Sequence, residues 1–397
     1  HFEKFNTMTD ECKEASQLDD YDKQEALITK GTEEATDSNL KMSKNFVAKL
    51  FEDLGGENWT DPALKNIEQN RQKNSILDQK NCIVKIELID NNLTGFLGKY
   101  FGDMKSLKTI NLMYNNLFGP IPLEIGFLPN LEELKLNSNK LSDNIPSEIG
   151  QLKGLNELVL AENQLTGKIP FEIGQLENLR SLKLNNNLLS GDIPSSIGRL
   201  KNLSLLHLKS NHLSGNIPNE LGKLENLCWL FLNYNLLKGF IPSELGLLKN
   251  LNALHIDNNE ITELGKLKNL KSLRLNNNQL KGLIPPELGN LENLTELYLK
   301  NNQLTGNIPP ELAGLQNLTL LYLNNNQLKG PVPQNFCNLH KLKLLDLSEN
   351  KLTGKFPPEV VSLPMLKDLR LENNKFSDDV PHHSFFNFEI LRRSKKG

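Results

Sequence analysis

The stretch LNELVLAENQLTGKIPFEIGQLEN (residues 155–178) is followed at once by LRSLKLNNNLLSGDIPSSIGRLKN (residues 179–202). Both fit the pattern L-x-x-L-x-L-x-x-N-x-L-x-G-x-I-P-x-x-I-G-x-L, which recurs every 24 residues along most of the chain. A fixed period of this length indicates a solenoid, in which each repeat forms one coil. Thirteen repeats begin at Ile83, Leu107, Leu131, Leu155, Leu179, Leu203, Leu227, Leu251, Leu270, Leu294, Leu318, Leu342 and Leu366.

Each position of the repeat has a physical reason. Leucines that alternate with polar residues, as in residues 134–136 (LKL), predict a short strand with its leucines directed inward. Gly at position 13 allows a turn, and the following Ile-Pro pair predicts an extended segment, because Pro offers no amide to a central strand ladder. The ending Ile-Gly-x-Leu, as in residues 173–176, predicts a short 3₁₀ turn on the far side of the coil.

Position 9 is Asn in every repeat. Its side chain is predicted to bond backbone groups of its own coil and of the neighbouring coil, which would otherwise be buried without partners. We therefore expect a structural ladder of stacked asparagines, formed by Asn91, Asn115, Asn139, Asn163, Asn187, Asn211, Asn235, Asn259, Asn278, Asn302, Asn326, Asn350 and Asn374.

The unit L-x-G-x-I-P-x-x-I/L-G-x-L, complete in residues 165–176 (LTGKIPFEIGQL), resembles the plant-specific class of leucine-rich repeat. That class is known from plant receptor-kinase ectodomains and polygalacturonase inhibitors, and the resemblance covers about 300 of the 397 residues. It implies an α/β repeat fold: a right-handed leucine-rich-repeat solenoid with a concave parallel β-sheet, a short second sheet, and 3₁₀ turns on the convex side. It also implies a non-enzymatic protein that binds a ligand, without identifying that ligand.

The sequence outside the repeats predicts two ends. Residues 1–42 are polar and acidic and are expected to be flexible, whereas residues 43–82 are expected to form an N-terminal cap. That cap begins with a helix over residues 43–54, and Trp59 is expected in its core rather than in a ligand site. The repeat array occupies residues 83–382, and residues 383–397 form a C-terminal cap with a basic tail.

One repeat, residues 251–269, is shorter than the others and lacks the Gly-x-Ile-Pro segment. We expect it to change the local curvature and to interrupt the second sheet. Two interpretations stay open: the short repeat shapes a binding surface, or it is a neutral deletion on the convex side.

The four cysteines leave the cellular compartment open. Cys228 and Cys337 lie on repeats four coils apart, too far for a disulfide with each other, so both are expected to be free thiols. Related plant proteins carry a cysteine pair in the cap, whereas here only Cys82 lies near the equivalent place and Cys12 is the other candidate. The repeat type favours a secreted or cell-surface location, and free cysteines favour the cytoplasm. Five glycosylation sequons do not decide between them, because about that many are expected by chance: Asn58, Asn92, Asn202, Asn293 and Asn317.

Strand residues between the inward leucines point outward and form columns across the sheet. In the middle of the array these columns are rich in aromatic and cationic residues, which dominate the energetics of binding surfaces. The alternative is that these large side chains only pack against one another across strands. The predicted ligand-binding residues on the concave face are Leu205, His207, Trp229, Phe231, Tyr234, His255, Arg274, Tyr298 and Tyr322.

Other functions find less support in the sequence. His207 and His255 lie two strands apart, too far to share a zinc ion, and no catalytic motif is present, so we expect no metal, no cofactor and no enzymatic activity. A net charge of −3 with scattered lysines and arginines disfavours nucleic acid, and no apolar run is long enough to span a membrane. The expected partner is a protein or peptide bound on the concave face, and the oligomeric state stays open. Two alternatives remain: an inhibitor of a secreted hydrolase, and the ectodomain fragment of a receptor-like kinase.

Overall fold

A computed structural model describes residues 54, 75–77, 83–263, 267 and 269–377. The chain divides into two bodies: the N-terminal body (residues 1–213 and 226–228) and the C-terminal body (residues 214–225 and 229–397). The predicted flexible segment, most of the predicted N-terminal cap with Trp59, and the predicted C-terminal cap lie outside the described residues.

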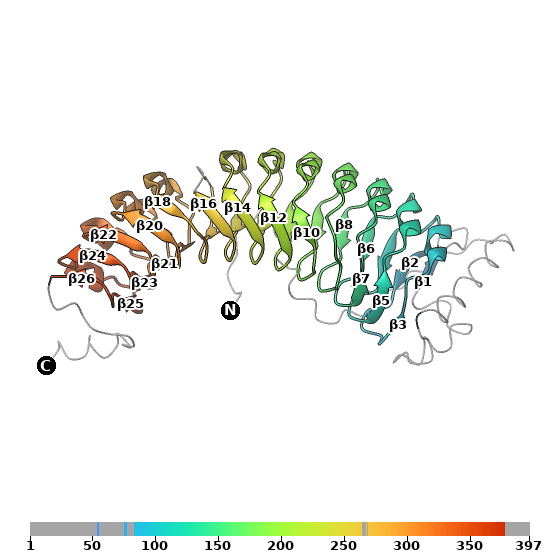
Figure 1. The fold of residues 1–397 in the computed structure, drawn as a ribbon, viewed down its shortest axis with the longest axis horizontal. Helices are drawn as coiled ribbons and strands as arrows, with labels where there is room; N and C mark the ends of the chain where they lie inside the picture. The colour runs from blue at the N-terminus through green and yellow to red at the C-terminus, as the bar shows by residue number, and fades with distance from the viewer. Residues whose placement is uncertain (1–53, 55–74, 78–82, 264–266, 268, 378–397) are drawn as a thin grey trace. The chain divides into compact units, whose positions relative to one another are not determined.

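Short strands at the same place in successive repeats form a parallel sheet in each body (Figure 1). Equal positions of neighbouring repeats pair with one another, as Leu134 does with Leu158 and Leu158 does with Leu182. In the N-terminal body the strands are β2 (Ile83–Glu87), β4 (Thr109–Asn111), β6 (Glu133–Lys135), β8 (Glu157–Val159), β9 (Ser181–Lys183) and β11 (Leu205–His207). In the C-terminal body they are β13 (Trp229–Phe231), β15 (Ala253–His255), β17 (Ser272–Arg274), β19 (Glu296–Tyr298), β21 (Leu320–Tyr322), β23 (Leu344–Asp346) and β25 (Asp368–Arg370). The predicted leucine-rich-repeat architecture is confirmed.

One strand was not predicted. Strand β1 (Ser75–Leu77) runs antiparallel to β2 and pairs Leu77 with Ile83. It therefore covers the outer edge of the first repeat, which would otherwise offer unpaired backbone groups. Three residues outside the repeats carry too little periodicity to predict a strand.

The core lies inside the coils and consists of the repeated leucines and isoleucines. In the repeat that starts at Leu131, the side chains of Leu134, Leu136, Leu141 and Ile149 are all fully buried. Each such burial contributes about 1.5–3 kcal/mol relative to exposure. The same positions are filled in the coil before and the coil after, so the core continues within each body from repeat to repeat.

Behind the sheet, most repeats make a 3₁₀ turn of five residues, as predicted from the Ile-Gly-x-Leu ending. Each turn from η4 onward starts after a Pro in extended conformation, such as Pro170 with φ −62°. The turns are η3 (Lys99–Asp103), η4 (Leu123–Phe127), η5 (Ser147–Gln151), η6 (Phe171–Gln175) and η7 (Ser195–Arg199) in the N-terminal body. In the C-terminal body they are η8 (Asn219–Lys223), η9 (Ser243–Leu247), η10 (Pro286–Asn290), η11 (Pro310–Gly314) and η12 (Gln334–Asn338), and the last is replaced by the α-helical turn α4 (Pro358–Val361).

The predicted second sheet is present but broken into pieces. In the N-terminal body it contains β3 (Thr94–Gly95), β5 (Asn116–Pro120) and β7 (Lys140–Ser142), followed by β10 (Ser190–Asp192). In the C-terminal body, residues 214–216 of β12 (His212–Asn216) pair with β14 (Leu236–Phe240), and β14 pairs with β16 (Glu260–Glu263). A separate sheet then contains β18 (Lys281–Leu283), β20 (Gln303–Gly306), β22 (Gln327–Gly330), β24 (Lys351–Gly354) and β26 (Lys375–Phe376). The break after β16 lies at the short repeat, so the predicted interruption is confirmed.

The asparagine at position 9 ties each coil to the one before it. The Asn163 Oδ1 atom accepts a hydrogen bond from the backbone N–H of Leu141 at 2.9 Å. Its Nδ2 group donates to the backbone carbonyl of Leu136, in the preceding coil, at 3.0 Å and to the carbonyls of Leu160 and Ala161 in its own coil. One side chain thus supplies partners to buried backbone groups of two coils.

A second row of asparagines, at position 24, was missed in the sequence. Asn130, Asn178 and Asn202 each donate from Nδ2 to the backbone carbonyl of the residue 25 positions earlier in the chain. Asn250 and Asn317 make the same bond in the C-terminal body. These bonds join the coils on the turn side, and the regular recurrence of Asn at position 24 was visible in the sequence.

The expectation for the cysteines was half wrong. Cys337 is a free thiol, but Cys228 is disulfide-bonded. The distance between repeats excluded only a bond between Cys228 and Cys337. The repeat spacing carries no information on the distance from Cys228 to the cysteines outside the repeats, so a disulfide of Cys228 was not excluded.

Candidate ligand-binding face

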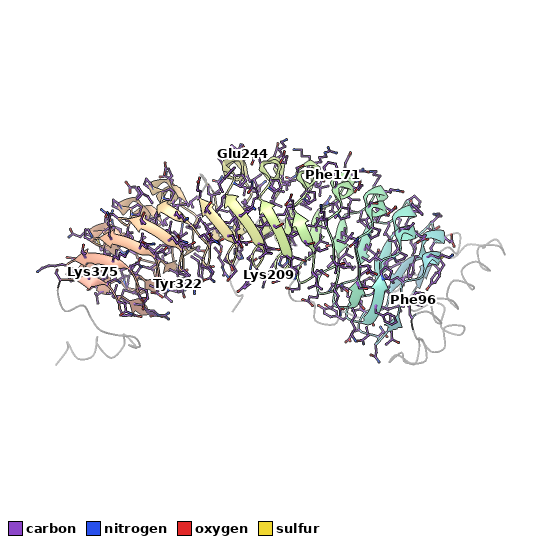
Figure 2. All side chains as sticks on the ribbon, in the orientation of Figure 1. Phe96, Phe171, Lys209, Glu244, Tyr322 and Lys375 are labelled. Atoms are coloured by element: carbon purple, nitrogen blue, oxygen red, sulfur yellow. The ribbon has the colours of Figure 1, made fainter. Side chains whose placement is uncertain are left out.

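The outward residues of the main sheet occupy positions 3, 5 and 7 of the repeats, and we call the surface that they form the strand face. In the C-terminal body Tyr322 lies on this face, whereas Glu244 lies on the turn side (Figure 2). In the N-terminal body Lys209 and Phe171 are separated in the same way. The predicted binding residues all come from the strands of this face or from the loop that directly follows a strand.

The first group in the C-terminal body is centred on β13. Trp229 and Phe231 are half-buried, whereas Tyr234 keeps 51% of its surface exposed. The Phe231 ring lies against the His255 ring, with the centroids 4.8 Å apart and the planes at 50°. The His255 Nε2 atom is in turn 3.2 Å from the Ser272 hydroxyl oxygen. Neighbouring strands therefore hold the first ring of this group in place.

The second group follows on β17, β19 and β21. The Arg274 guanidinium lies over the Tyr298 ring at 4.9 Å and forms an ion pair with Glu296 at 3.0 Å. The other neighbour of Tyr298 is Tyr322, whose ring stacks on it with the centroids 4.7 Å apart. The Lys300 Nζ atom lies 5.3 Å from the centre of the Tyr322 ring. These contacts form a row of cation–π and aromatic interactions across three strands.

Partial burial changes the acidity of both tyrosines. Burial, together with the nearby Glu296 carboxylate, raises the pKa of Tyr298 to about 12, although the Arg274 charge opposes the shift. Burial also raises the pKa of Tyr322. Both phenols are therefore neutral at physiological pH and can donate a hydrogen bond to a ligand.

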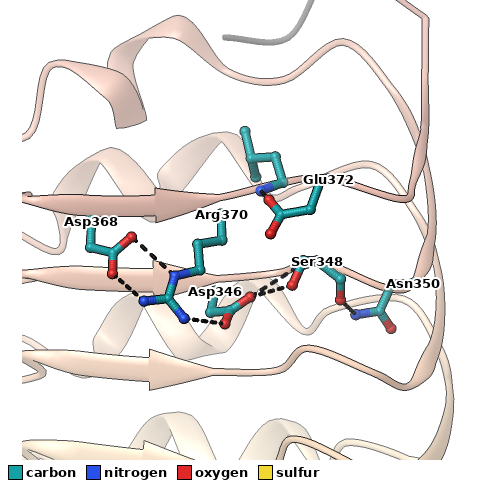
Figure 3. Close-up of polar contacts among 7 residues, drawn as sticks. Asp346, Ser348, Asn350, Asp368, Arg370 and Glu372 are labelled. Carbon is teal, nitrogen blue, oxygen red and sulfur yellow. Dashed lines mark hydrogen bonds and ion pairs between the residues drawn. The ribbon is translucent and has the colours of Figure 1, made fainter. Parts of the chain in front are cut away.

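A polar cluster closes the row on β23 and β25 (Figure 3). Asp346 is buried, and its Oδ1 atom accepts hydrogen bonds from the Ser348 hydroxyl at 2.6 Å and from the Ser348 amide at 3.2 Å. The Arg370 guanidinium lies between two carboxylates, 2.6 Å from Asp368 and 3.5 Å from Asp346. Burial raises the pKa of Asp346 against these favourable contacts, whereas the hydrogen bond with Asp368 raises the pKa of Arg370.

Two predicted residues lie in the N-terminal body, on β11. Leu205 is almost fully buried, with 5% of its surface exposed, and His207 is partly buried. Burial and the charges of Lys183 and Lys209 lower the pKa of His207 to about 3. The imidazole is therefore neutral at physiological pH.

The structure thus brings Phe231 and His255 together, and separately Arg274, Tyr298 and Tyr322. Mutual packing across strands, the alternative considered from the sequence, accounts for part of their burial. It leaves Tyr234 exposed and the other aromatic residues of the two groups partly exposed. The assignment of these residues to a ligand stays a prediction.

Sequence reasoning missed an amide row along the rim of this face, at position 8. Asn277 donates to the side-chain oxygen of Asn258 at 2.8 Å, Asn301 donates to Asn277 at 2.5 Å, and Asn325 donates to Asn301 at 3.0 Å. All four residues have positive φ, between 53° and 57°, a conformation that asparagine tolerates better than most residues. The run of Asn at position 8 was the available signal.

No group of three potential metal ligands occurs among the described residues. In the same part of the chain, no helix is both long and apolar enough to cross a membrane.

Two family models match the chain. Residues 130–152, 154–176, 178–200 and 202–224 match a model described as Leucine Rich Repeat. Residues 268–328 and 316–376 match a second model, described as Leucine rich repeat. No curated protein matches the sequence closely enough to count as a relative.

Several solved structures share the fold. The crystal structure of PEPR1–AtPEP1 is 31% identical, with a TM-score of 0.74 and coverage of 87% of this chain and 53% of that one. The plant peptide hormone receptor RGFR1 in complex with RGF2 is 30% identical, with a TM-score of 0.58 and coverage of 84% of this chain and 63% of that one. A leucine-rich-repeat protein from Leptospira interrogans is 36% identical, with a TM-score of 0.56 and coverage of 75% of this chain and 80% of that one. The chain therefore spans less than two thirds of the first two structures.

Proposed function

Because the chain belongs to the leucine-rich-repeat family, we propose that it is a recognition module that binds a protein or peptide ligand on its strand face. The centre of the proposed site is the C-terminal body, from Trp229 to Tyr322. Recognition needs no chemistry beyond binding, and the site contains the aromatic and arginine side chains that dominate binding energy in protein interfaces.

One observation carries this proposal: large aromatic side chains lie half-buried in a row on the strand face. The stacked pair of Tyr298 and Tyr322 and the pair of Phe231 and His255 are held by their neighbours. Ordered side chains lose little conformational entropy when a ligand covers them, so they bind more tightly than mobile ones.

The similarity to a plant peptide hormone receptor in complex with RGF2 supports a peptide as the ligand class. An extended peptide fits a flat strand surface because its side chains reach successive strands about 4.8 Å apart. The hydroxyl groups of Tyr298 and Tyr322 and the amide row of Asn258, Asn277, Asn301 and Asn325 would supply hydrogen bonds to its backbone.

A display library of random peptides, selected on the full chain, tests this proposal. Selection is run in parallel on the wild type, on the double variant Trp229→Ala/Phe231→Ala, and on Phe240→Ala. Phe240 is an aromatic residue of the same repeat that is 48% exposed on the second sheet, so it controls for loss of an exposed ring. Enrichment of related sequences on the wild type and on Phe240→Ala, but not on the double variant, is the expected result. Equal enrichment on all three chains would contradict the site.

A further inference from the structure

We infer that the strand face of the C-terminal body binds an acidic side chain of the ligand, an aspartate or a glutamate, at the stacked pair of Tyr298 and Tyr322. Arg274 and Lys300 lie beside these two rings and supply the positive charge. The inference deepens the proposed function and rests on it, because it names a chemical group that the peptide carries. All four residues belong to the C-terminal body.

The repeat arranges six outward side chains in two rows on three neighbouring strands. The row at position 5, whose members pair with one another in the sheet, consists of Arg274, Tyr298 and Tyr322. The row at position 7 consists of Asn276, Lys300 and Asn324. The backbone N–H of Asn277 donates to the Lys300 carbonyl at 3.1 Å, so the register of the strands continues to the second row. Neighbouring strands lie about 4.8 Å apart and the two rows about 7 Å apart, so one carboxylate can reach both rows, and none of the six residues is acidic.

The first observation that indicates an anionic group is an arginine with donors to spare. The Arg274 Nη2 atom is 3.0 Å from Glu296, and the guanidinium lies over the Tyr298 ring. The Nε atom of the same side chain is buried and has no hydrogen-bond partner. A guanidinium has five N–H donors in one plane, and 39% of this side chain is exposed. Arg274 can therefore bind a second carboxylate besides that of Glu296.

The second observation is a lysine without a carboxylate. The Lys300 Nζ atom lies 5.3 Å from the centre of the Tyr322 ring, and it forms no ion pair with any residue that the structure describes. Arg370, farther along the same face, gives the contrast, because it lies 2.6 Å from Asp368 and 3.5 Å from Asp346. Its charge is already balanced by two acids. A ligand carboxylate is therefore attracted to Lys300 rather than to Arg370.

The hydroxyl groups between these cations are also donors. Within the described part of the chain, neither the Tyr298 nor the Tyr322 hydroxyl makes a hydrogen bond, and each one that does not bond the peptide backbone can donate to a carboxylate. The nearest acceptor is already occupied, since the Glu296 carboxylate is bound by Arg274 and lies 3.3 Å from the Ser272 hydroxyl. Donors thus outnumber available acceptors around the two rings. A carboxylate, which only accepts, suits this surface, whereas a lysine or an arginine of the ligand does not.

The test uses two small probes on the full chain. N-acetylglutamic acid amide carries one charged group, the side-chain carboxylate, and N-acetylglutamine amide is its uncharged counterpart. Each probe is titrated at neutral pH and constant ionic strength, and the ring signals of isotope-labelled Tyr298 and Tyr322 are followed by NMR. We expect a saturable shift with the glutamate probe and none with the glutamine probe. Absence of a saturable shift with the glutamate probe, or the same response to both probes, would overturn the inference.

Two lysine variants make the result specific. Lys300→Gln is expected to raise the half-saturating concentration of the glutamate probe by about tenfold or more, because hydrogen bonds to charged groups are strong. Lys329→Gln removes the same charge from an exposed lysine of β22, in the second sheet of the C-terminal body, and should leave that concentration unchanged. Equal half-saturation in Lys300→Gln and the wild type would also overturn the inference. The glutamine probe makes a parallel test on the unaltered chain.

The peptide selection separates this inference from the proposed function. Peptides enriched on the wild type are expected to share an aspartate or a glutamate at one position, and Lys300→Gln should abolish that preference. Enriched peptides that are lost on the Trp229→Ala/Phe231→Ala variant but share no acidic position would leave the proposed function standing and overturn this inference. Enrichment of no peptide at all would overturn the proposed function, whatever the glutamate probe does.

Discussion

The rings of Tyr298 and Tyr322 stack with their planes only 15° from parallel and their centroids 4.7 Å apart. The two tyrosines occupy the same position of adjacent repeats and pair with each other in the sheet. A solenoid with a fixed period brings equal positions together at the strand spacing, so a chain can build a row of stacked rings merely by repeating an aromatic residue. The Arg274 guanidinium extends this row by one strand.

We expect the two tyrosines to be coupled in stability. In a double-mutant cycle of Tyr298→Ala and Tyr322→Ala, the coupling free energy should be about 0.5–1.5 kcal/mol, as for other aromatic pairs. Denaturant unfolding of the four proteins measures it. The pair Tyr298→Ala and Tyr234→Ala serves as the control, since these residues lie three repeats apart and should be additive within about 0.5 kcal/mol. If the losses in free energy of unfolding from Tyr298→Ala and Tyr322→Ala were additive, the stacking of the two rings would contribute nothing to stability.

The position-9 asparagine should be far more important for stability than another asparagine two residues away. Asn139 accepts a hydrogen bond from the backbone N–H of Leu117 at 3.0 Å and donates to three backbone carbonyls, including that of Leu112 in the preceding coil. Asn139→Ala should lower the free energy of unfolding by about 2–4 kcal/mol, because buried backbone groups lose their partners. Asn137→Ala, which removes an amide whose oxygen has no partner, should cost less than about 1 kcal/mol. Comparable losses in the two variants would refute the role of the ladder.

The turn glycines should tolerate no side chain where coils approach closely. A Cβ atom on Gly289 would collide with the backbone carbonyl of Glu311 in the next coil, whereas a Cβ atom on Gly282 would meet nothing within 4 Å. Gly289→Ala should therefore lower the free energy of unfolding by at least about 3 kcal/mol. Gly282→Ala should cost about 1 kcal/mol, the penalty of its φ of +79° for a residue with a side chain. The midpoints of thermal unfolding compare the two, and a smaller effect at Gly289 would contradict the packing of the turns.

His207 should make the protein lose stability in mild acid. Its pKa in the folded chain is about 3, below the ordinary 6.5, so the unfolded chain binds a proton more readily between these values. The stability that this residue contributes is present above pH 6.5 and is lost as the pH falls toward 3. His207→Asn should lose less stability than the wild type between pH 7 and pH 4 in denaturant titrations. Parallel losses in the two proteins would argue against a buried neutral imidazole.

The sequence repeat predicted the fold well because the contacts that form the core join each coil only to the neighbouring coils. A leucine at a given position is buried by its own coil and the next, so spacing alone identified the strands, the turns and the interruption at the short repeat. Strand β1 was missed because it lies outside the repeats, and its pairing with β2 depends on a chain reversal that spacing does not encode. The disulfide of Cys228 was missed for the same reason.

The candidate site was less predictable than the fold. The sequence placed Tyr298, Tyr322 and Arg274 in one column, but it did not show that Arg274 would lie over a ring or that Leu205 would be almost fully buried. Such details depend on the side-chain conformations of neighbouring residues, which the spacing does not determine.

The affinity of one selected peptide for three proteins tests the central claim most directly. Its dissociation constant is measured by isothermal titration with the wild type, with Trp229→Ala/Phe231→Ala and with Phe240→Ala, after circular dichroism has shown that all three are folded. If the strand face of the C-terminal body is the binding site, the double variant should bind at least about thirtyfold more weakly, and Phe240→Ala should stay within about twofold of the wild type. Equal dissociation constants for the wild type and the folded double variant would contradict the claim.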